Sequence, residues 1–135
     1  MTSRKFWRVP TSKLRVKPSG KNSNAAHKAS ASVEYLGQRG SNCDGLETGS
    51  NGLIYLGAPE QDGIQTYDPE TGTFSDLLHD NRVFWPDTLS VAQSKLYFVD
   101  NQFYLQGRFN SGDDRTKKPY ALYSIEIDNE AAHLE

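Results

Sequence analysis

A short pattern of residues occurs twice in this chain, and it restricts the possible folds more than any other feature of the sequence. The first copy begins with Asp44-Gly45-Leu46 and continues, after a polar link, with the apolar run 53–56. The second copy begins with Asp87-Thr88-Leu89 and continues with the apolar run 96–99. Short strands that repeat every ~40–50 residues are typical of the blades of a β-propeller. Because closed propellers need at least ~4 blades, these 135 residues predict about two blades of a larger ring.

The alternation of short apolar runs with turn residues predicts an all-β fold built from antiparallel four-stranded sheets. The expected strands lie at 5–9, 33–36, 44–48, 52–57, 63–68, 73–77, 87–91, 95–99 and 119–127. Divided into blades, the chain contains the end of a preceding blade with a loop or short helix (1–43), a complete four-stranded blade (44–80), a further blade with a long polar loop at 107–118 (81–128), and a tail (129–135).

Two local patterns refine this division. Residues 10–12 interrupt the first strand, and Lys13-Leu14-Arg15-Val16 continues after them. The polar stretch 17–32 fits a solvated loop, and its Ala-rich part at 24–31 also fits a short helix capped by Asn22 or Ser23. The run from Asp68 to Thr73 predicts a hairpin, because its Pro suits a type I turn and its Gly suits a left-handed position.

Charge, apolar runs and cysteine content limit the partners and the cellular location that the sequence allows. Fifteen basic and seventeen acidic residues give a net charge of −2, which favours neither nucleic acid nor an anionic membrane as a partner. The chain has no apolar run of the ~18 residues that a membrane span needs. Its first residues lack the apolar centre of a signal peptide, so the sequence is compatible with a cytoplasmic location. Cys43 is the only cysteine, so the chain cannot form an internal disulfide.

The repeated aspartates are the first candidates for a site. Asp44 and Asp87 each precede an innermost strand, which would place both near one end of the propeller channel, where propellers bind ligands. Two carboxylates there can coordinate a hard cation such as Ca²⁺, with Asn101 as a third oxygen ligand, or can bind an amine. The structural alternative is an aspartate that accepts backbone N–H bonds in the turn before its strand.

Other candidates surround the second repeat. Trp85-Pro86 can form an apolar wall above Asp87, or can pack between blades. Asn101-Gln102 can reach a ligand or can form a polar turn. Arg108 can pair with an anionic ligand, although a surface ion pair with Asp113 or Asp114 is the expected arrangement.

The histidines and the cysteine show no catalytic spacing. His27, His79 and His133 are widely separated and form no zinc-ligand pair, so we expect solvated side chains. Cys43 has no evident neighbouring base in sequence, which favours a buried structural thiol over a nucleophile.

Several segments, taken in order, resemble the yellow / major royal jelly protein family, in its bacterial and fungal branch. The resemblance spans roughly residues 3–128 and is most specific at Trp85-Pro86-Asp87-Thr88-Leu89-Ser90. The chain differs from the family pattern at Tyr104 and Gly107, where family members usually carry His and Pro. The other matching segments are Phe6–Arg15, Val33–Gly37, Asp44–Glu47, Asn101-Gln102, Arg108-Phe109 and Lys118–Leu122.

The resemblance implies a six-bladed propeller of more than twice this length, of which the chain matches the C-terminal part. It also implies an extracellular protein. Known activities in the family are scattered and include small-amine binding, pigment-related roles and nutritional storage, so family resemblance predicts fold better than function.

Three hypotheses follow for the function. The first is a non-catalytic module that binds a small ligand or a protein and needs no cofactor. The second is an enzyme, a metal-assisted lactonase-like hydrolase or isomerase, with Asp44, Asp87 and Asn101 as oxygen ligands at the channel mouth. The third concerns assembly: because unpaired edge strands associate readily, exposed blade edges would pair with further copies of the chain.

Overall fold

The computed structural model describes residues 3–17, 19–20, 23–128, 130 and 132. The chain divides into two compact units, Arg4–Arg39 and a larger one that comprises Gly40–Glu135 with Met1–Ser3. The predicted blade boundaries at 43, 80 and 128 are a different division, and they stay predictions.

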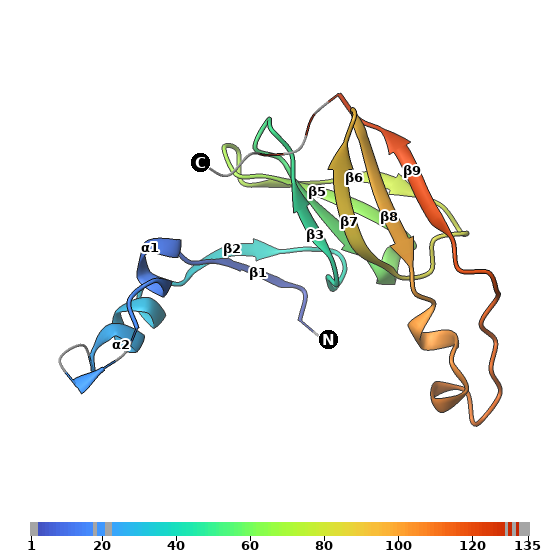
Figure 1. The fold of residues 1–135 in the computed structure, drawn as a ribbon, viewed down its shortest axis with the longest axis horizontal. Coiled ribbons are helices and arrows are strands. Elements are labelled where there is room, and N and C mark those ends of the chain that lie inside the picture. The colour runs from blue at the N-terminus through green and yellow to red at the C-terminus, as the bar shows by residue number, and fades with distance from the viewer. Residues whose placement is uncertain (1–2, 18, 21–22, 129, 131, 133–135) are drawn as a thin grey trace. The chain divides into compact units, whose positions relative to one another are not determined.

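The larger unit consists of two antiparallel sheets (Figure 1). The first has the order β3-β4-β5-β6, and the second has the order β7-β8-β9. These sheets confirm the predicted all-β fold, and each strand predicted beyond residue 44 is present, although the last one begins at Leu122 and not at residue 119. The strands are β3 (Leu46–Thr48), β4 (Ile54–Ala58), β5 (Gly63–Asp68), β6 (Thr73–His79), β7 (Pro86–Ala92), β8 (Lys95–Asp100) and β9 (Leu122–Glu126).

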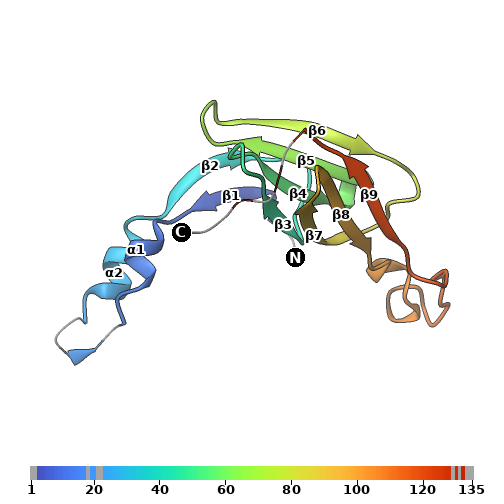
Figure 2. The same ribbon diagram turned by 45° about the horizontal axis from the view of Figure 1, so that its top comes forward.

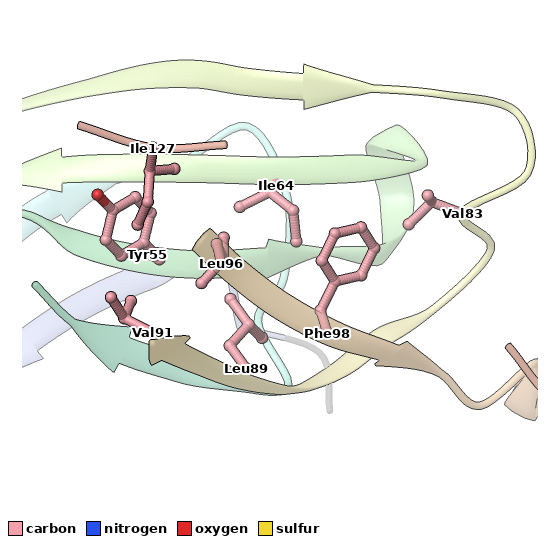
Figure 3. Close-up of a cluster of buried hydrophobic side chains, with 8 residues drawn as sticks. All are labelled: Tyr55, Ile64, Val83, Leu89, Val91, Leu96, Phe98 and Ile127. Carbon is pink, nitrogen blue, oxygen red and sulfur yellow. The ribbon is translucent and has the colours of Figure 1, made fainter. Parts of the chain in front are cut away.

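The core of this unit lies between the two sheets (Figure 3). Leu96 and Phe98 of β8 alternate with more exposed residues, so period-two spacing turns both toward the first sheet. Both are almost completely buried, as is Ile64 of β5 on the opposite side. Burying an apolar side chain of this size stabilises the fold by about 1.5–3 kcal/mol. The cluster comprises Tyr55, Ile64, Val83, Leu89, Val91, Leu96, Phe98 and Ile127.

The predicted hairpin between β5 and β6 has the expected turn chemistry. The Asp68 carboxylate accepts the Glu70 backbone N–H (2.8 Å) and the Thr71 hydroxyl (2.8 Å). Gly72 has a φ of 71°, in the left-handed region that glycine tolerates best. The turn therefore confirms the predicted position and the left-handed glycine, and the Asp68 hydrogen bonds are an additional feature of the structure.

The first strands of the two sheets, β3 and β7, lie side by side in close backbone contact. A Cβ atom built on Gly45 would lie 1.4 Å from the carbonyl oxygen of Asp87. A Cβ atom on Gly57 of β4 would lie 2.3 Å from the carbonyl oxygen of Pro86. Only glycine allows the backbones to approach this closely, and the approach brings the two repeated aspartates to one place.

The smaller unit is a two-stranded hairpin with two short helices (Figure 2). Its strands β1 (Lys5–Arg8) and β2 (Glu34–Gln38) pair antiparallel. Trp7 and Tyr35 face each other across the pair with ring centroids 4.7 Å apart. Arg8 and Glu34 form an exposed ion pair (2.7 Å).

Two helices occupy the connection between β1 and β2. The residues that follow the interruption of the first strand begin in a helix, because Thr11–Leu14 form α1, whose first turn is closed by a hydrogen bond from the Lys13 N–H to the Pro10 carbonyl (2.9 Å). The alternative of a helix within 24–31 is confirmed by α2 (Ala25–Ser30). Its N-cap is Asn24 and not Ser23, and Asn22 lies outside the described residues.

Two further observations bear on partners. Among the described residues, the helices are too short and too polar to cross a bilayer. In the same part of the chain, β9 pairs only with β8, so the other edge of β9 has no partner strand. Leu122, the first residue of β9, is 67% exposed. The expected self-association through blade edges stays a prediction.

Candidate functional site

The candidate site lies where β3 and β7 begin and where β8 ends. Five residues meet there and form what we call the Trp85 cluster: Asp44, Trp85, Asp87, Asp100 and Asn101. The loop that follows β8 continues from this end of the sheet, as Figure 1 shows. Four of the five residues were candidates from the sequence.

Asp44 is held by a tryptophan and not by the turn that precedes its strand. The indole Nε1–H of Trp85 donates to the Asp44 carboxylate at 2.6 Å. The two residues are far apart in sequence, and the close contact of β3 with β7 brings them together. The expected turn role of Asp44 is therefore replaced by a long-range contact that positions the Trp85 ring.

Asp87 and Asn101 form the second contact of the cluster. The Asn101 side-chain amide donates to the Asp87 carboxylate at 3.1 Å, and its carbonyl oxygen accepts the Phe103 N–H at 2.8 Å. The Asn101 N–H donates to the Trp85 carbonyl at 3.1 Å. Asn101 thus forms the predicted polar turn and also contacts Asp87, and its contact with a ligand stays a prediction.

Asp100 was not among the predicted site residues. It is 3% exposed, and its carboxylate accepts the Trp85 backbone N–H at 2.5 Å. Its alternation with Leu96 and Phe98 along β8 turns it inward, which the period-two pattern of the strand could have indicated. Because it holds the Trp85 backbone, it fixes the chain position from which the indole reaches Asp44.

Aromatic rings from the loop after β8 line the cluster. The ring centroid of Trp85 lies 5.4 Å from that of Phe103 and 6.0 Å from that of Tyr104. Burial and the negative charges of Asp62 and Asp100 raise the pKa of Tyr104. These rings, missed in the sequence, are partly exposed, and only Trp85 and buried Pro86 belong to the predicted apolar wall.

Gln102 connects the two ends of this loop by hydrogen bonds to Lys117, and its predicted contact with a ligand stays a prediction. Its side-chain amide donates to the Lys117 carbonyl at 2.9 Å, and its carbonyl oxygen accepts the Lys117 N–H at 2.8 Å. The residue is 5% exposed and has a φ of 51°. This double hydrogen bond closes the loop, so Gln102 positions Asn101 and Phe103.

The expected ion pair of Arg108 is replaced by aromatic contacts. Its guanidinium carbon lies 4.6 Å from the ring centroid of Phe103 and 4.9 Å from that of Phe109. Arg115 pairs instead with Asp113 (2.8 Å). The Asp114 carboxylate accepts hydrogen bonds from Thr116.

The charge of the Trp85 cluster is negative. Within the part of the chain that the structure describes, the hydrogen-bond donors to its three carboxylates are an indole, a side-chain amide and a backbone N–H. The ion pairs of the same part involve other acids. No three His, Cys, Asp or Glu side chains among the described residues are placed to hold a metal ion, and calcium binding stays a prediction.

The remaining candidates are the histidines and Cys43, and none of them belongs to the Trp85 cluster. His27 and His79 are exposed, and a ring nitrogen of His79 lies 2.6 Å from the Gln61 carbonyl oxygen. His133 lies outside the described residues. Cys43 is partly exposed and not buried as expected, and its thiol contacts the Gly45 carbonyl at 3.2 Å.

Comparison with known proteins identifies the family. No curated protein matches the chain in sequence. The family model described as Major royal jelly protein matches residues 1–126, which is most of the chain. This match and the antiparallel sheets together confirm the predicted propeller-type fold. The protein therefore belongs to the major royal jelly protein family.

Proposed function

We propose that this protein is a non-catalytic β-propeller module that binds a small ligand carrying a protonated amine at the Trp85 cluster. One observation carries the proposal: the Asp44 and Asp100 carboxylates accept hydrogen bonds from Trp85, the Asp87 carboxylate accepts one from Asn101, and all three donors are neutral groups. A neutral donor satisfies a hydrogen bond but leaves the negative charge uncompensated. A cation supplied by a ligand would compensate it.

The aromatic rings favour an organic cation. The Trp85 ring lies beside the Asp44 carboxylate, and an ammonium group gains about 0.5–2 kcal/mol over the face of such a ring. The indole of Trp85 is also oriented in advance by Asp44, so binding need not order it. Carboxylate and aromatic groups together form the usual chemistry of an amine site.

The contacts of the cluster support binding without catalysis. A nucleophile or general base needs a partner that takes up or releases a proton near neutral pH. The side-chain partners of Asp44 and Asp87 are the Trp85 indole and the Asn101 amide, and neither group titrates in this range. The arrangement holds the side chains in place and supplies no proton relay.

Calorimetric titration with phenethylamine and with its neutral analogue 2-phenylethanol tests this function. We expect the amine to bind at least about tenfold more tightly than the alcohol, because a charge-assisted hydrogen bond contributes about 1.5–3 kcal/mol. Asp44→Asn keeps an acceptor for the Trp85 indole but removes the charge, so it should weaken amine binding by a similar factor.

Asp76→Asn is the matched control, because the Asp76 carboxylate contacts Gln65 and lies outside the cluster. It should leave amine affinity unchanged. Equal affinity for amine and alcohol, or no binding of either, would refute the proposal. Calcium chloride serves as a separate titrant: saturable binding that a chelator reverses would favour the metal-assisted hydrolase or isomerase. From the usual setting of the family, we also propose an extracellular location.

A further inference from the structure

The loop after β8 forms a second, separate feature beyond the Trp85 cluster. Its backbone is folded by internal hydrogen bonds, from the Arg115 N–H to the Leu105 carbonyl (2.9 Å) and from the Gly112 N–H to the Gly107 carbonyl (2.8 Å). The Asn110 side-chain amide donates to the Tyr104 (2.8 Å) and Gln106 (3.0 Å) carbonyls. Such cross-linking gives the loop one defined shape that can present side chains to a ligand.

Arg108 is the side chain that this shape presents. The rings of Phe103 and Phe109 lie 4.9 Å apart and form one aromatic surface, over which the guanidinium lies. Stacking occupies the faces of a guanidinium but leaves the N–H groups at its edge available. Among the described residues, these N–H groups donate to no acceptor, and the side chain is exposed.

An open, shallow cleft of about 450 Å³ is lined in part by Arg108. Arg108 and Lys118 bring two positive charges and Asp114 one negative charge. One Asp114 oxygen already accepts both the N–H and the hydroxyl of Thr116. These bonds, together with the charge of Lys118, lower the pKa of Asp114. The lining residues are Gln106, Arg108, Asp114, Thr116, Lys118 and Tyr120.

We propose that this cleft binds an oxyanion, a carboxylate or a phosphoryl or sulfuryl group, through the edge of the Arg108 guanidinium. The fork of N–H donors on an arginine matches the paired oxygens of these groups. Stacking on Phe103 and Phe109 restricts the guanidinium before the ligand arrives, which lowers the ordering cost of binding. Lys118 adds a second cation, and Tyr120 adds a hydroxyl donor.

Titration of the ¹⁵N-labelled full chain by NMR tests this site. Sodium phosphate, sulfate and acetate are added separately at constant ionic strength, with sodium chloride as the balancing salt. We expect saturable shifts of the Arg108 Nε–H signal with at least one of the three anions. Saturation by acetate alone identifies a carboxylate site, and saturation by phosphate or sulfate identifies a tetrahedral one. Shifts that do not saturate with any of the three overturn the proposal.

Three variants complete the test. Arg108→Gln should weaken binding of the saturating anion about tenfold or more, because hydrogen bonds to charged groups contribute about 1.5–3 kcal/mol. Asp114→Asn should tighten binding, because it removes the opposing charge and can keep a contact with Thr116. Arg115→Gln is the control: its arginine lies in the same loop but pairs with Asp113, so binding should not change.

Each outcome decides the question. Unchanged affinity in Arg108→Gln, or weaker binding in Asp114→Asn, would overturn the proposal, as would an equal loss in Arg108→Gln and Arg115→Gln. If Arg108→Gln does not fold, Asp114→Asn and Arg115→Gln still test the assignment by their opposite expectations.

Discussion

The contact between β3 and β7 depends on one missing side chain, at Gly45. An alanine Cβ there would lie 1.4 Å from the Asp87 carbonyl oxygen, 2.5 Å from its carbonyl carbon and 2.8 Å from a methyl carbon of Leu89. The first two atoms belong to backbone and cannot rotate away. Gly45→Ala must therefore separate β3 from β7, which are the first strands of the two sheets.

The size of this effect follows from the distances. A carbon atom and a carbonyl oxygen approach to about 3.3 Å, so the Asp87 carbonyl would have to move by about 2 Å. A gap of 0.5–1 Å already forfeits a quarter to a half of a dispersion contact. Overpacking costs about 1–3 kcal/mol when side chains can adjust. Because backbone must move here, we expect Gly45→Ala to lower the free energy of unfolding by about 3 kcal/mol or more.

Urea unfolding followed by tryptophan fluorescence measures this change, and two other glycines calibrate it. A Cβ on Gly57 would lie 2.3 Å from the Pro86 carbonyl oxygen, so Gly57→Ala requires a smaller movement and should cost less. A Cβ on Gly20 meets no atom within 4 Å, so Gly20→Ala should be neutral within about 0.5 kcal/mol. Gly45→Ala with the stability of Gly20→Ala, or a cost below that of Gly57→Ala, would refute the steric argument.

Two further predictions concern the surface and the loop. Hydrogen bonds from Arg82 lower the pKa of Asp80 from 3.8 to about 2, so this carboxylate contributes stability above pH 3.8 and loses it as the pH falls through about 2. In an NMR titration, Arg82→Gln should return the midpoint toward 3.8, and an unchanged midpoint would contradict the assignment. Gln102→Ala removes both part-buried hydrogen bonds to the Lys117 backbone, at a cost of about 0.5–1.5 kcal/mol for each bond. Hydrogen exchange of the Lys117 N–H should then accelerate about tenfold or more, whereas persistent protection would show that another group closes the loop.

Local chemistry explains what the sequence predicted well. The turn between β5 and β6 was predictable because Asp68 and Gly72 act within a few residues of each other. The strands on either side were predictable because alternation along a strand is also local. In the smaller unit, the helical turn of α1 was not predicted, and the hydrogen bond from the Lys13 N–H to the Pro10 carbonyl closes it.

The candidate site was predictable as a set of residues but not as a set of contacts. Asp44 and Asp87 were found from the repeat, and Trp85 and Asn101 from their neighbourhood in the second copy. The bond between Asp44 and the Trp85 indole joins residues that precede the first strands of two different sheets. No local pattern encodes such a bond.

The sequence by itself determined the all-β fold, the positions of most strands and the tight turn between β5 and β6, because each depends on residues close together in the chain. Only the tertiary structure decided that the two copies of the repeat meet at Gly45. It also decided that the Asp100 carboxylate accepts the Trp85 backbone N–H and that Arg108 stacks on aromatic rings. These contacts depend on how closely two backbones approach and on how one loop closes. Those are properties of packing between distant segments, and no single stretch of residues contains them.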